Sequence, residues 1–462
     1  MSQHEFDLAV TGDIVFHNTI VNNGTIYIEG ERIAAFSDTP GDFRFGRHID
    51  ARNKLVFPGA IDSHVHSLSY PGEGFGNSTK AACAGGVTTI IDMPVDAPAG
   101  IATPEALKKK IAEVEKESHV DVALLGSVKN DTLEHITGLS EAGACGFKLS
   151  LFDTDPDRFP RVSDGRLLEA FARIAETGLT AGVHAENDEI IKDLISQYQK
   201  EGKTYPLAHC QTRPEVSETE SVLKGLEIAR AAGVRFHLYH ISCSRAIDLA
   251  QYYRKDGNPV TIETCPHYLI FSEKDMESLK GKLRINPPVR KKGESERLWQ
   301  KLQSGQIDCV SSDHAPWPVE KKNKSSIFDN ASGAPGVETL LPLLFSEGVS
   351  KSRISVFKLA EAVMENPAKI FGLFPQKGTL SIGSDADITV FDPRQKWTVR
   401  AEELHSIAGW TPYEGMEVTG KVDTTIVRGK IVYHKGEITD GQGHGRFIHP
   451  LNNYQHLNKS KG

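Results

Sequence analysis

Eight short apolar or β-branched segments between residues 55 and 316 alternate with stretches that have the spacing of amphipathic helices. The segments are 55–66, 87–94, 120–128, 145–151, 180–186, 235–242, 260–269 and 308–316. Strands separated by helices are typical of βα units with a parallel sheet, and eight such units predict a (β/α)8 TIM barrel of the α/β class. Two helices have clear ends: Thr103 and Pro104 suit a helix start, and Gly178 follows the helical pattern of 165–177.

The two ends of the chain have a different pattern. Residues 6–54 and 376–440 alternate like strands that are joined by Gly and Asn turns. We therefore expect a small β-sandwich domain built from residues 1–54 and 371–445, with the barrel spanning 55–370. The last stretch, 446–462, shows no clear period, and we expect it to pack on a neighbouring subunit or to be disordered.

Residues with metal-binding chemistry recur at the carboxyl ends of the predicted strands, which is where the active site of such a barrel lies. The set is His64, His66, Lys148, His184, His240 and Asp313. His64 and His66 are two positions apart, so on an extended strand their side chains point to the same face. A single strand-end histidine is usually only hydrogen-bonded, but this set at corresponding ends of five strands indicates a metal centre.

Four imidazoles and a carboxylate suit divalent zinc, with manganese, iron or cobalt as alternatives, and they exceed what one tetrahedral metal needs. We therefore expect two metals. A charged ammonium at Lys148 would not fit beside them, because two cations would repel it. Burial and nearby positive charge lower a lysine pKa, and a neutral amine reacts with carbon dioxide to give a carbamate that bridges two metals. Such a pair would activate a bridging hydroxide and polarise a carbonyl, while Asp313 moves its proton to a leaving nitrogen.

Composition limits the kinds of molecule that this protein can be expected to bind. The net charge of −8 and the pI near 6.2 give no general attraction for nucleic acid or an anionic membrane. The six cysteines are widely spread, which indicates buried thiols in a reducing compartment. The sequence shows no secretory signal and no apolar run long enough for a membrane span. We expect a soluble, cytoplasmic protein that acts on small molecules.

The motifs "IDSHVHS", "GFKLS", "VHAEND", "LYHIS", "ETCPHYLIFS" and "SSDHAP" resemble those of the cyclic amidohydrolases of the amidohydrolase superfamily: allantoinases, hydantoinases (dihydropyrimidinases) and dihydroorotases. The resemblance covers almost the whole chain. It implies a homodimer or homotetramer that opens a cyclic amide or ureide at a C–N bond.

The resemblance also assigns roles to residues. It places His64, His66, Lys148 and Asp313 on one metal. The other metal is shared by Lys148, as N6-carboxylysine, with His184 and His240. It further implies substrate contacts at four positions: Asn286, His267, Ser332 and Gly333.

Several residues that relatives carry are missing from this chain, and their absence limits the choice of substrate ring. Allantoinase is the nearest resemblance around Lys148–Glu186, and no Tyr of the hydantoinase type follows the lysine before Asp153. The loop after His66 lacks the Arg that dihydroorotases and many allantoinases carry, and Asp96 follows the second strand. A substrate carboxylate buried without a cationic partner is energetically unfavourable, so we expect a substrate ring that carries no carboxylate group. A cation could still come from another loop, at Arg158, Arg161 or Arg245.

Several alternatives remain. The first is a hydantoinase- or dihydropyrimidinase-like enzyme, or another cyclic imide or ureide hydrolase, with dihydroorotase less favoured. A scaffold protein related to dihydropyrimidinase would have lost metal ligands, whereas all six positions are filled here. A deaminase of the same superfamily would lack the carboxylated lysine, so Lys148 argues against it.

Overall fold

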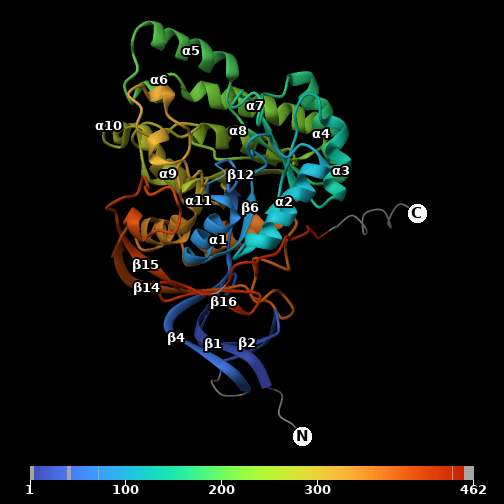
Figure 1. Ribbon diagram of the computed structural model, residues 1–462, viewed down its shortest axis with the longest axis vertical. Helices are drawn as coiled ribbons and strands as arrows, with labels where there is room; N and C mark the ends of the chain where they lie inside the picture. Colours follow the sequence, from blue (N-terminus) through green and yellow to red (C-terminus); the bar gives the residue numbers. More distant parts are fainter. Residues whose placement is uncertain (1–4, 39–42, 71, 440, 452–462) are drawn as a thin grey trace, which may run out of the picture.

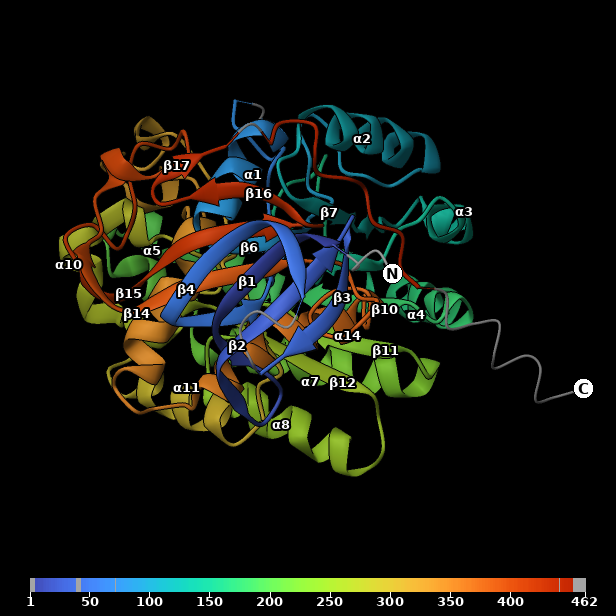
Figure 2. The ribbon, with the colours of Figure 1, turned by 90° about the horizontal axis from the view of Figure 1, so that it is seen from below.

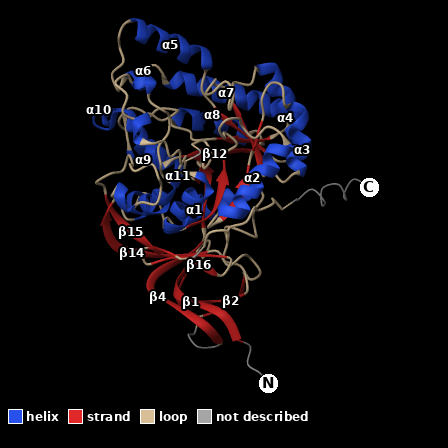
Figure 3. Cartoon of the chain, viewed as in Figure 1, coloured by secondary structure: helices blue, strands red, loops and turns tan. Residues whose placement is uncertain are grey.

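The computed structural model describes residues 5–38, 43–70, 72–439 and 441–451. Its larger part is the expected parallel barrel, with helices around it and a smaller sheet beneath (Figures 1 and 3). The barrel strands are β5 Ala60–Val65, β6 Val87–Asp92, β7 Asp121–Leu124, β8 Gly126–Ser127, β9 Gly146–Ser150, β10 Thr180–His184, β11 Arg235–Leu238, β12 Val260–Thr264 and β13 Cys309–Val310. β7 and β8 flank Leu125 in one continuous stretch, so together they occupy one of eight positions.

The barrel closes between β5 and the segment that follows β13. The His66 amide donates to the His314 carbonyl at 2.9 Å, and the His314 amide donates to the His64 carbonyl at 3.2 Å. These bonds join the first strand to the last, as a closed barrel requires. The closure therefore places His64, His66 and Asp313 beside one another.

Helices of the ring follow most of the strands (Figure 1). They are α1 Gly74–Ala84, α2 Pro104–Glu117, α3 Ile136–Glu141, α4 Asp164–Thr177, α5 Asp188–Lys200, α6 Ala208–Gln211, α7 Glu215–Ala232, α8 Ser244–Lys255, α9 Pro266–Ile270, α10 Met276–Leu279, α11 Glu294–Gln303, α12 Leu340–Leu344, α13 Val356–Ala360 and α14 Asn366–Ile370. Two expected boundaries are confirmed. The Thr103 hydroxyl accepts a hydrogen bond from the Ala106 amide at the start of α2, and Gly178 ends α4 in a left-handed conformation.

Both chain ends contribute to the smaller sheet, which Figure 2 shows from below. Its strands are β1 Glu5–Val15, β2 Ile20–Glu29, β3 Arg32–Ser37, β4 Arg44–Pro58, β14 Ile388–Thr398, β15 Glu417–Val427, β16 Lys430–His434 and β17 Glu437–Ile438. They form one sheet in the order β17-β16-β15-β14-β4-β1-β2-β3, and the two halves meet where β4 pairs with β14.

The smaller sheet encloses a core of its own, although its strands are not split into two separately bonded sheets. The turns after β2 and β15 meet, because a Cβ added at Gly429 would lie 2.4 Å from the Gly30 carbonyl oxygen. Apolar side chains from both chain ends, among them Val10, Ile28 and Ile388, form one buried cluster there. The sandwich-like core is thus produced by a single curled sheet.

Several predicted strands have different limits. The expected strand 55–66 is divided: Leu55 to Pro58 belong to β4, and the barrel strand begins after Gly59. Gly59 permits this junction, because an added Cβ would lie 2.0 Å from the Thr88 hydroxyl. The expected strands 260–269 and 308–316 end early, at Thr264 and Val310. Pro266 begins α9, since proline suits the first helical turn.

The expected tail, 446–462, is described only to residue 451. In that part the Val122 amide donates to the Arg446 carbonyl and the Ile448 amide to the Val122 carbonyl, both at 2.9 Å. This stretch therefore packs on the barrel of its own chain, so the expectation of disorder is wrong for 446–451. Residues 452–462 lie outside the described part. All six cysteines are buried free thiols, and no described helix is long and apolar enough to cross a membrane.

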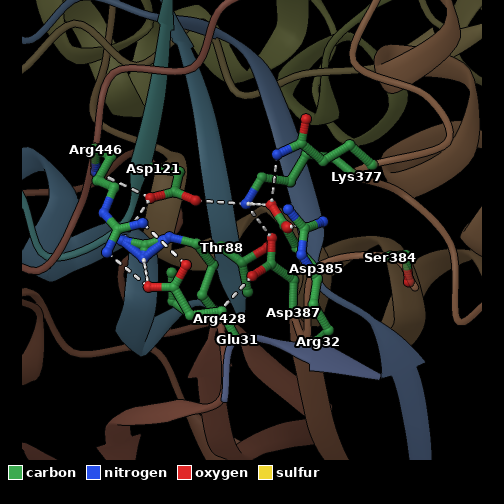
Figure 4. A network of polar contacts seen from close by, with 12 residues as sticks. Glu31, Arg32, Thr88, Asp121, Lys377, Ser384, Asp385, Asp387, Arg428 and Arg446 are labelled. Carbon is green, nitrogen blue, oxygen red and sulfur yellow. Dashed lines mark hydrogen bonds and ion pairs between the residues drawn. The ribbon is translucent and has the colours of Figure 1, made fainter. Parts of the chain in front are cut away.

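A buried ionic network joins the barrel to the smaller domain (Figure 4). The Lys377 ammonium lies 2.9 Å from Asp385 and 2.7 Å from Asp387, and it also contacts Asp121 at the start of β7. Lys377 and the three carboxylates are almost fully buried. The three aspartates are close enough to hold a metal, but the lysine already supplies the cation. We interpret this cluster as structural.

Replacing Lys377 with Met is expected to lower the free energy of unfolding by about 3–5 kcal/mol, because the buried Asp387 carboxylate loses its counter-ion. Asp121 and Asp385 lose one partner as well, but each keeps an arginine, Arg428 and Arg32 respectively. The measurement is the urea midpoint followed by circular dichroism. Lys369→Met is the matched control, since Lys369 is exposed and its surface ion pair with Glu365 contributes about 1 kcal/mol or less. Equal midpoints for the two variants would contradict the structural role of the network.

Candidate metal centre

The six predicted ligands converge at the carboxyl ends of the barrel strands. Lys148 lies on β9 and His184 ends β10, while His240 and Asp313 lie just beyond β11 and β13. The Lys148 Nζ atom is 2.6 Å from His64 Nε2, and Asp313 Oδ1 is 3.2 Å from the same nitrogen. Asp313 Oδ1 is also 3.5 Å from His66 Nε2. His184 Nδ1 and His240 Nε2 are 3.1 Å apart.

Hydrogen bonds behind two of the histidines determine which nitrogen faces the centre. His64 Nδ1 is 2.7 Å from Glu263 Oε1, so Nδ1 carries the proton and Nε2 presents its lone pair. His184 is held the other way round, because its Nε2 lies 2.8 Å from Glu186 and leaves Nδ1 facing inward. Glu186 is fixed in turn by Arg213 at 2.6 Å.

His66 is oriented by a hydroxyl group. Its Nδ1 is 3.0 Å from Ser69 Oγ, which donates its own proton to the Val95 carbonyl at 2.9 Å. Since a hydroxyl has one proton, Ser69 accepts from His66 Nδ1–H, and His66 Nε2 is left with a lone pair. Three imidazoles therefore direct lone pairs at one region, which is what a metal requires of its ligands.

The protonation states also suit metal ligands. Burial lowers the pKa of His66 to about 4, and it lowers the pKa of His240 well below the usual value, so both imidazoles are neutral. Burial would raise the pKa of Asp313, but its close contacts with the His64 and His66 rings, at 3.2 and 3.5 Å, hold that pKa well below the usual range, so Asp313 is ionised.

Lys148 has the environment expected of a lysine that can lose its proton. Burial lowers the pKa of its ammonium to about 8, although the Asp313 and Glu263 carboxylates oppose this. Its Nζ lies 4.8 Å from the centre of the Tyr239 ring and 5.7 Å from that of Phe159. A neutral amine is the form that reacts with carbon dioxide.

Two of the six positions have left-handed backbone conformations. His240 has φ of 40° and Asp313 has φ of 49°. Non-glycine residues adopt such angles at a cost of about 1–3 kcal/mol, and they persist where the surrounding structure holds them. In both cases the turn brings a residue beyond the strand end back toward the centre.

A cavity of about 680 Å³, open to solvent, lies above these residues. Three of the four predicted substrate contacts line it: Asn286, Ser332 and Gly333. The Asn286 side-chain oxygen is buried without a hydrogen-bond partner among the described residues, which suits an acceptor for a substrate N–H. His267 does not line this cavity; it is buried beside Tyr268, and burial lowers its pKa to about 4.

The loop at Ser332 and Gly333 is held by groups of its own chain. The Ser332 carbonyl accepts from Trp317 Nε1 at 2.8 Å, and the Gly333 carbonyl accepts from Lys322 at 2.7 Å. Gly333 has φ of 106°, and an added Cβ would lie 2.5 Å from that of Ala315. This glycine therefore permits the close approach of the two loops that line the cavity.

The structure places the Asp96 carboxylate on a buried lysine and not in the cavity. The carboxylate is 2.7 Å from the buried Lys110 ammonium, which also contacts Asp92 at 2.6 Å. The charge of Asp96 is thus compensated away from the cavity, and Val95 lines the cavity instead. Of the three candidate cations, only Arg158 lines the cavity; Arg161 lies near Asp164, Asp188 and Glu189, and Arg245 is exposed.

Sequence reasoning missed the residues that orient the histidines: Glu263, Glu186, Ser69 and Arg213. One signal was available for Glu263. A glutamate inside the otherwise uncharged strand "VTIET" is rarely buried unless it has a partner.

A profile of the Amidohydrolase family matches residues 55–432. An L-hydantoinase of Paenarthrobacter aurescens is 35% identical over 449 residues, covering 96% of this chain and 98% of that protein. An allantoinase of Rubrobacter xylanophilus is 34% identical over 449 residues with the same coverage. The solved L-hydantoinase (dihydropyrimidinase) from Arthrobacter aurescens superposes with a TM-score of 0.93 at 36% identity, covering 96% of this chain and 100% of that one.

Proposed function

The chain belongs to the amidohydrolase family and is a cyclic amidohydrolase, and we propose that two divalent metals at its strand ends serve the opening of a cyclic ureide. Allantoin is the first candidate substrate and a hydantoin the second. An L-hydantoinase and an allantoinase are about equally similar to this chain, at 35% and 34% identity, so the comparisons support both substrates about equally.

The single observation that carries the proposal is the direction of the imidazole lone pairs. Glu263, Ser69 and Glu186 each hold one nitrogen of a histidine and leave the other facing the same region. We propose that His64, His66 and Asp313 hold one metal, that His184 and His240 hold the other, and that Lys148, carboxylated by carbon dioxide, bridges them. Zinc suits this donor set best, with manganese, iron or cobalt as alternatives.

When bound, such metals activate a water molecule and polarise the scissile carbonyl group. The chain itself supplies the proton transfer. Asp313 is ionised, so it can take a proton from the attacking water and deliver it to the ring nitrogen as the C–N bond breaks. Asn286 is available to accept from a ring N–H, while Trp317 and Phe159 flank the cavity.

The test is hydrolysis of a panel of cyclic amides by metal-loaded protein. The panel comprises allantoin, hydantoin, dihydropyrimidines, dihydroorotate, cyclic imides and cyclic ureas. Ring opening of allantoin or a hydantoin is expected. No ring opening of any of these compounds would contradict the proposed function.

Glu263→Gln and Glu186→Gln are expected to weaken metal binding by about 10–100-fold, which is the usual effect of losing the carboxylate behind a metal-bound histidine. Glu263 acts on His64 and Glu186 on His184, so each variant should weaken a different metal of the pair. Titration with a chelator and metal analysis measure the effect. Glu227→Gln, on the surface beside Arg230, is the control. Unchanged affinity in both variants would contradict the assigned ligand atoms.

We also propose that the protein is a homodimer or homotetramer located in the cytoplasm. The assembly is supported by exposed apolar side chains on the neighbouring helices α4 and α7: Leu168, Val216 and Leu223 are 46%, 53% and 42% exposed. Light scattering of the purified protein measures its molar mass, and the mass of a monomer would contradict the proposed oligomer.

A further inference from the structure

An arginine and an aspartate from the segment between β9 and α4 lie on the wall of the cavity. Arg158 and Asp155 both line it, together with Thr154 and Phe159 of the same segment. Their side chains are 19% and 25% exposed. The site described above does not use this charged pair.

Asp155 holds Arg158 in place. Its Oδ1 accepts from the backbone amides of Asp157 at 3.1 Å and Arg158 at 2.9 Å. Its Oδ2 lies 2.8 Å from both Nε and Nη2 of Arg158. A carboxylate has about four acceptor positions, and all of them are directed at this turn and its guanidinium. Asp155 is therefore a positioning residue.

Arg158 retains donors for a ligand. Its Nη1 donates to the Ser69 carbonyl at 3.1 Å, so contacts with described residues use three of its five N–H groups. Ser69 is the residue whose hydroxyl holds His66. The guanidinium of Arg158, from the segment between β9 and α4, therefore reaches the loop after His66, and that loop has no arginine of its own.

The charge of the pair indicates what it binds. Asp155 neutralises Arg158, so a substrate carboxylate would meet little net positive charge, whereas a neutral carbonyl oxygen needs only the free N–H groups. We propose that Arg158 donates to the oxygen of a neutral exocyclic group, such as a ureido or carbamoyl substituent, on the ring that is opened. This rests on the proposed function and deepens it, because it selects a ureide with a ureido substituent, as in allantoin, over unsubstituted hydantoin.

The first test compares kcat/KM for allantoin with that for unsubstituted hydantoin. In Arg158→Gln the ratio of the two values is expected to fall by about 10-fold or more, the scale of a hydrogen bond from a charged donor. Arg161→Gln is the control, because that arginine lies on the same segment but does not line the cavity. An unchanged ratio in Arg158→Gln would overturn the assignment and leave Arg158 only as a support for Ser69.

The second test changes the charge and keeps the shape. Asp155→Asn leaves Arg158 with an uncompensated positive charge, so kcat/KM for hydantoin-5-acetate is expected to rise about 10-fold relative to that for allantoin. Loss of folding or of loop structure would not produce a gain for the anionic substrate. A constant ratio would contradict the charge balance on which the assignment depends.

The two proposals fail in different ways. If the wild-type protein opens neither allantoin nor hydantoin, the proposed function is wrong, and the role of Arg158 with it. If it opens both substrates and the variants change kcat/KM for both by the same factor, only the role of Arg158 is wrong.

Discussion

Replacing Lys148 with Ala is expected to lower ring opening by at least about 10³-fold and to lower the bound metal at the same time. Lys148 is buried between the two groups of histidines, with its Nζ 2.6 Å from His64 Nε2. In our proposal its carbamate is the ligand common to both metals, so its loss removes the activation of the water nucleophile. Kinetics with the best substrate of the panel and elemental analysis of the same samples measure both effects.

A short carboxylic acid added with metal should restore part of the activity of Lys148→Ala, since it supplies the missing oxygen ligands in the space that the side chain leaves. Lys192→Ala is the matched control, because Lys192 is exposed and pairs with Asp153 and Asp188 at the surface. Full activity with two metals in Lys148→Ala would exclude the bridge.

Asp313→Asn is expected to keep most of the metal and to lower kcat by about 10²-fold or more, the scale of general acid–base catalysis. The carboxylate lies within 3.5 Å of both His64 and His66, and the surrounding histidines hold its pKa well below the usual range. An amide of the same shape preserves an oxygen ligand but cannot carry the proton to the leaving nitrogen. The rate of a single turnover, measured with metal content, separates the two roles.

The control for this variant is Asp248→Asn, whose carboxylate pairs with Lys301 on the surface. Normal turnover of an Asp313→Asn protein that holds two metals would show that another group transfers the proton.

The architecture was predictable because its signals are local. Alternation of apolar strands with amphipathic helices is visible within short windows, and the Thr103 cap and the Gly178 stop lie in the same windows. The errors occurred where a strand ends. Leu55–Pro58 continue the apolar run of the barrel strand, yet they pair with β14, more than 300 residues later in the chain. No local pattern distinguishes these partners.

The convergence of the six predicted metal ligands was also predictable, because parallel strands in a barrel bring their carboxyl ends to one face. Their orientation was not predictable. His64 depends on Glu263, which is 199 positions away, and His66 depends on Ser69, whose hydroxyl is held by Val95. Which nitrogen of each imidazole faces the centre follows from those contacts alone.

The sequence by itself determined the barrel, the small domain made from both chain ends, and the set of residues that meet at the strand ends. Only the tertiary structure decided how charge is distributed around the cavity. Asp96 is neutralised by Lys110, and Arg158 from the segment after β9 lies beside the loop after His66. Hydrophobic periodicity is set by neighbouring residues, but an ion pair or a hydrogen bond depends on distances of a few ångströms between segments that only the packed fold brings together.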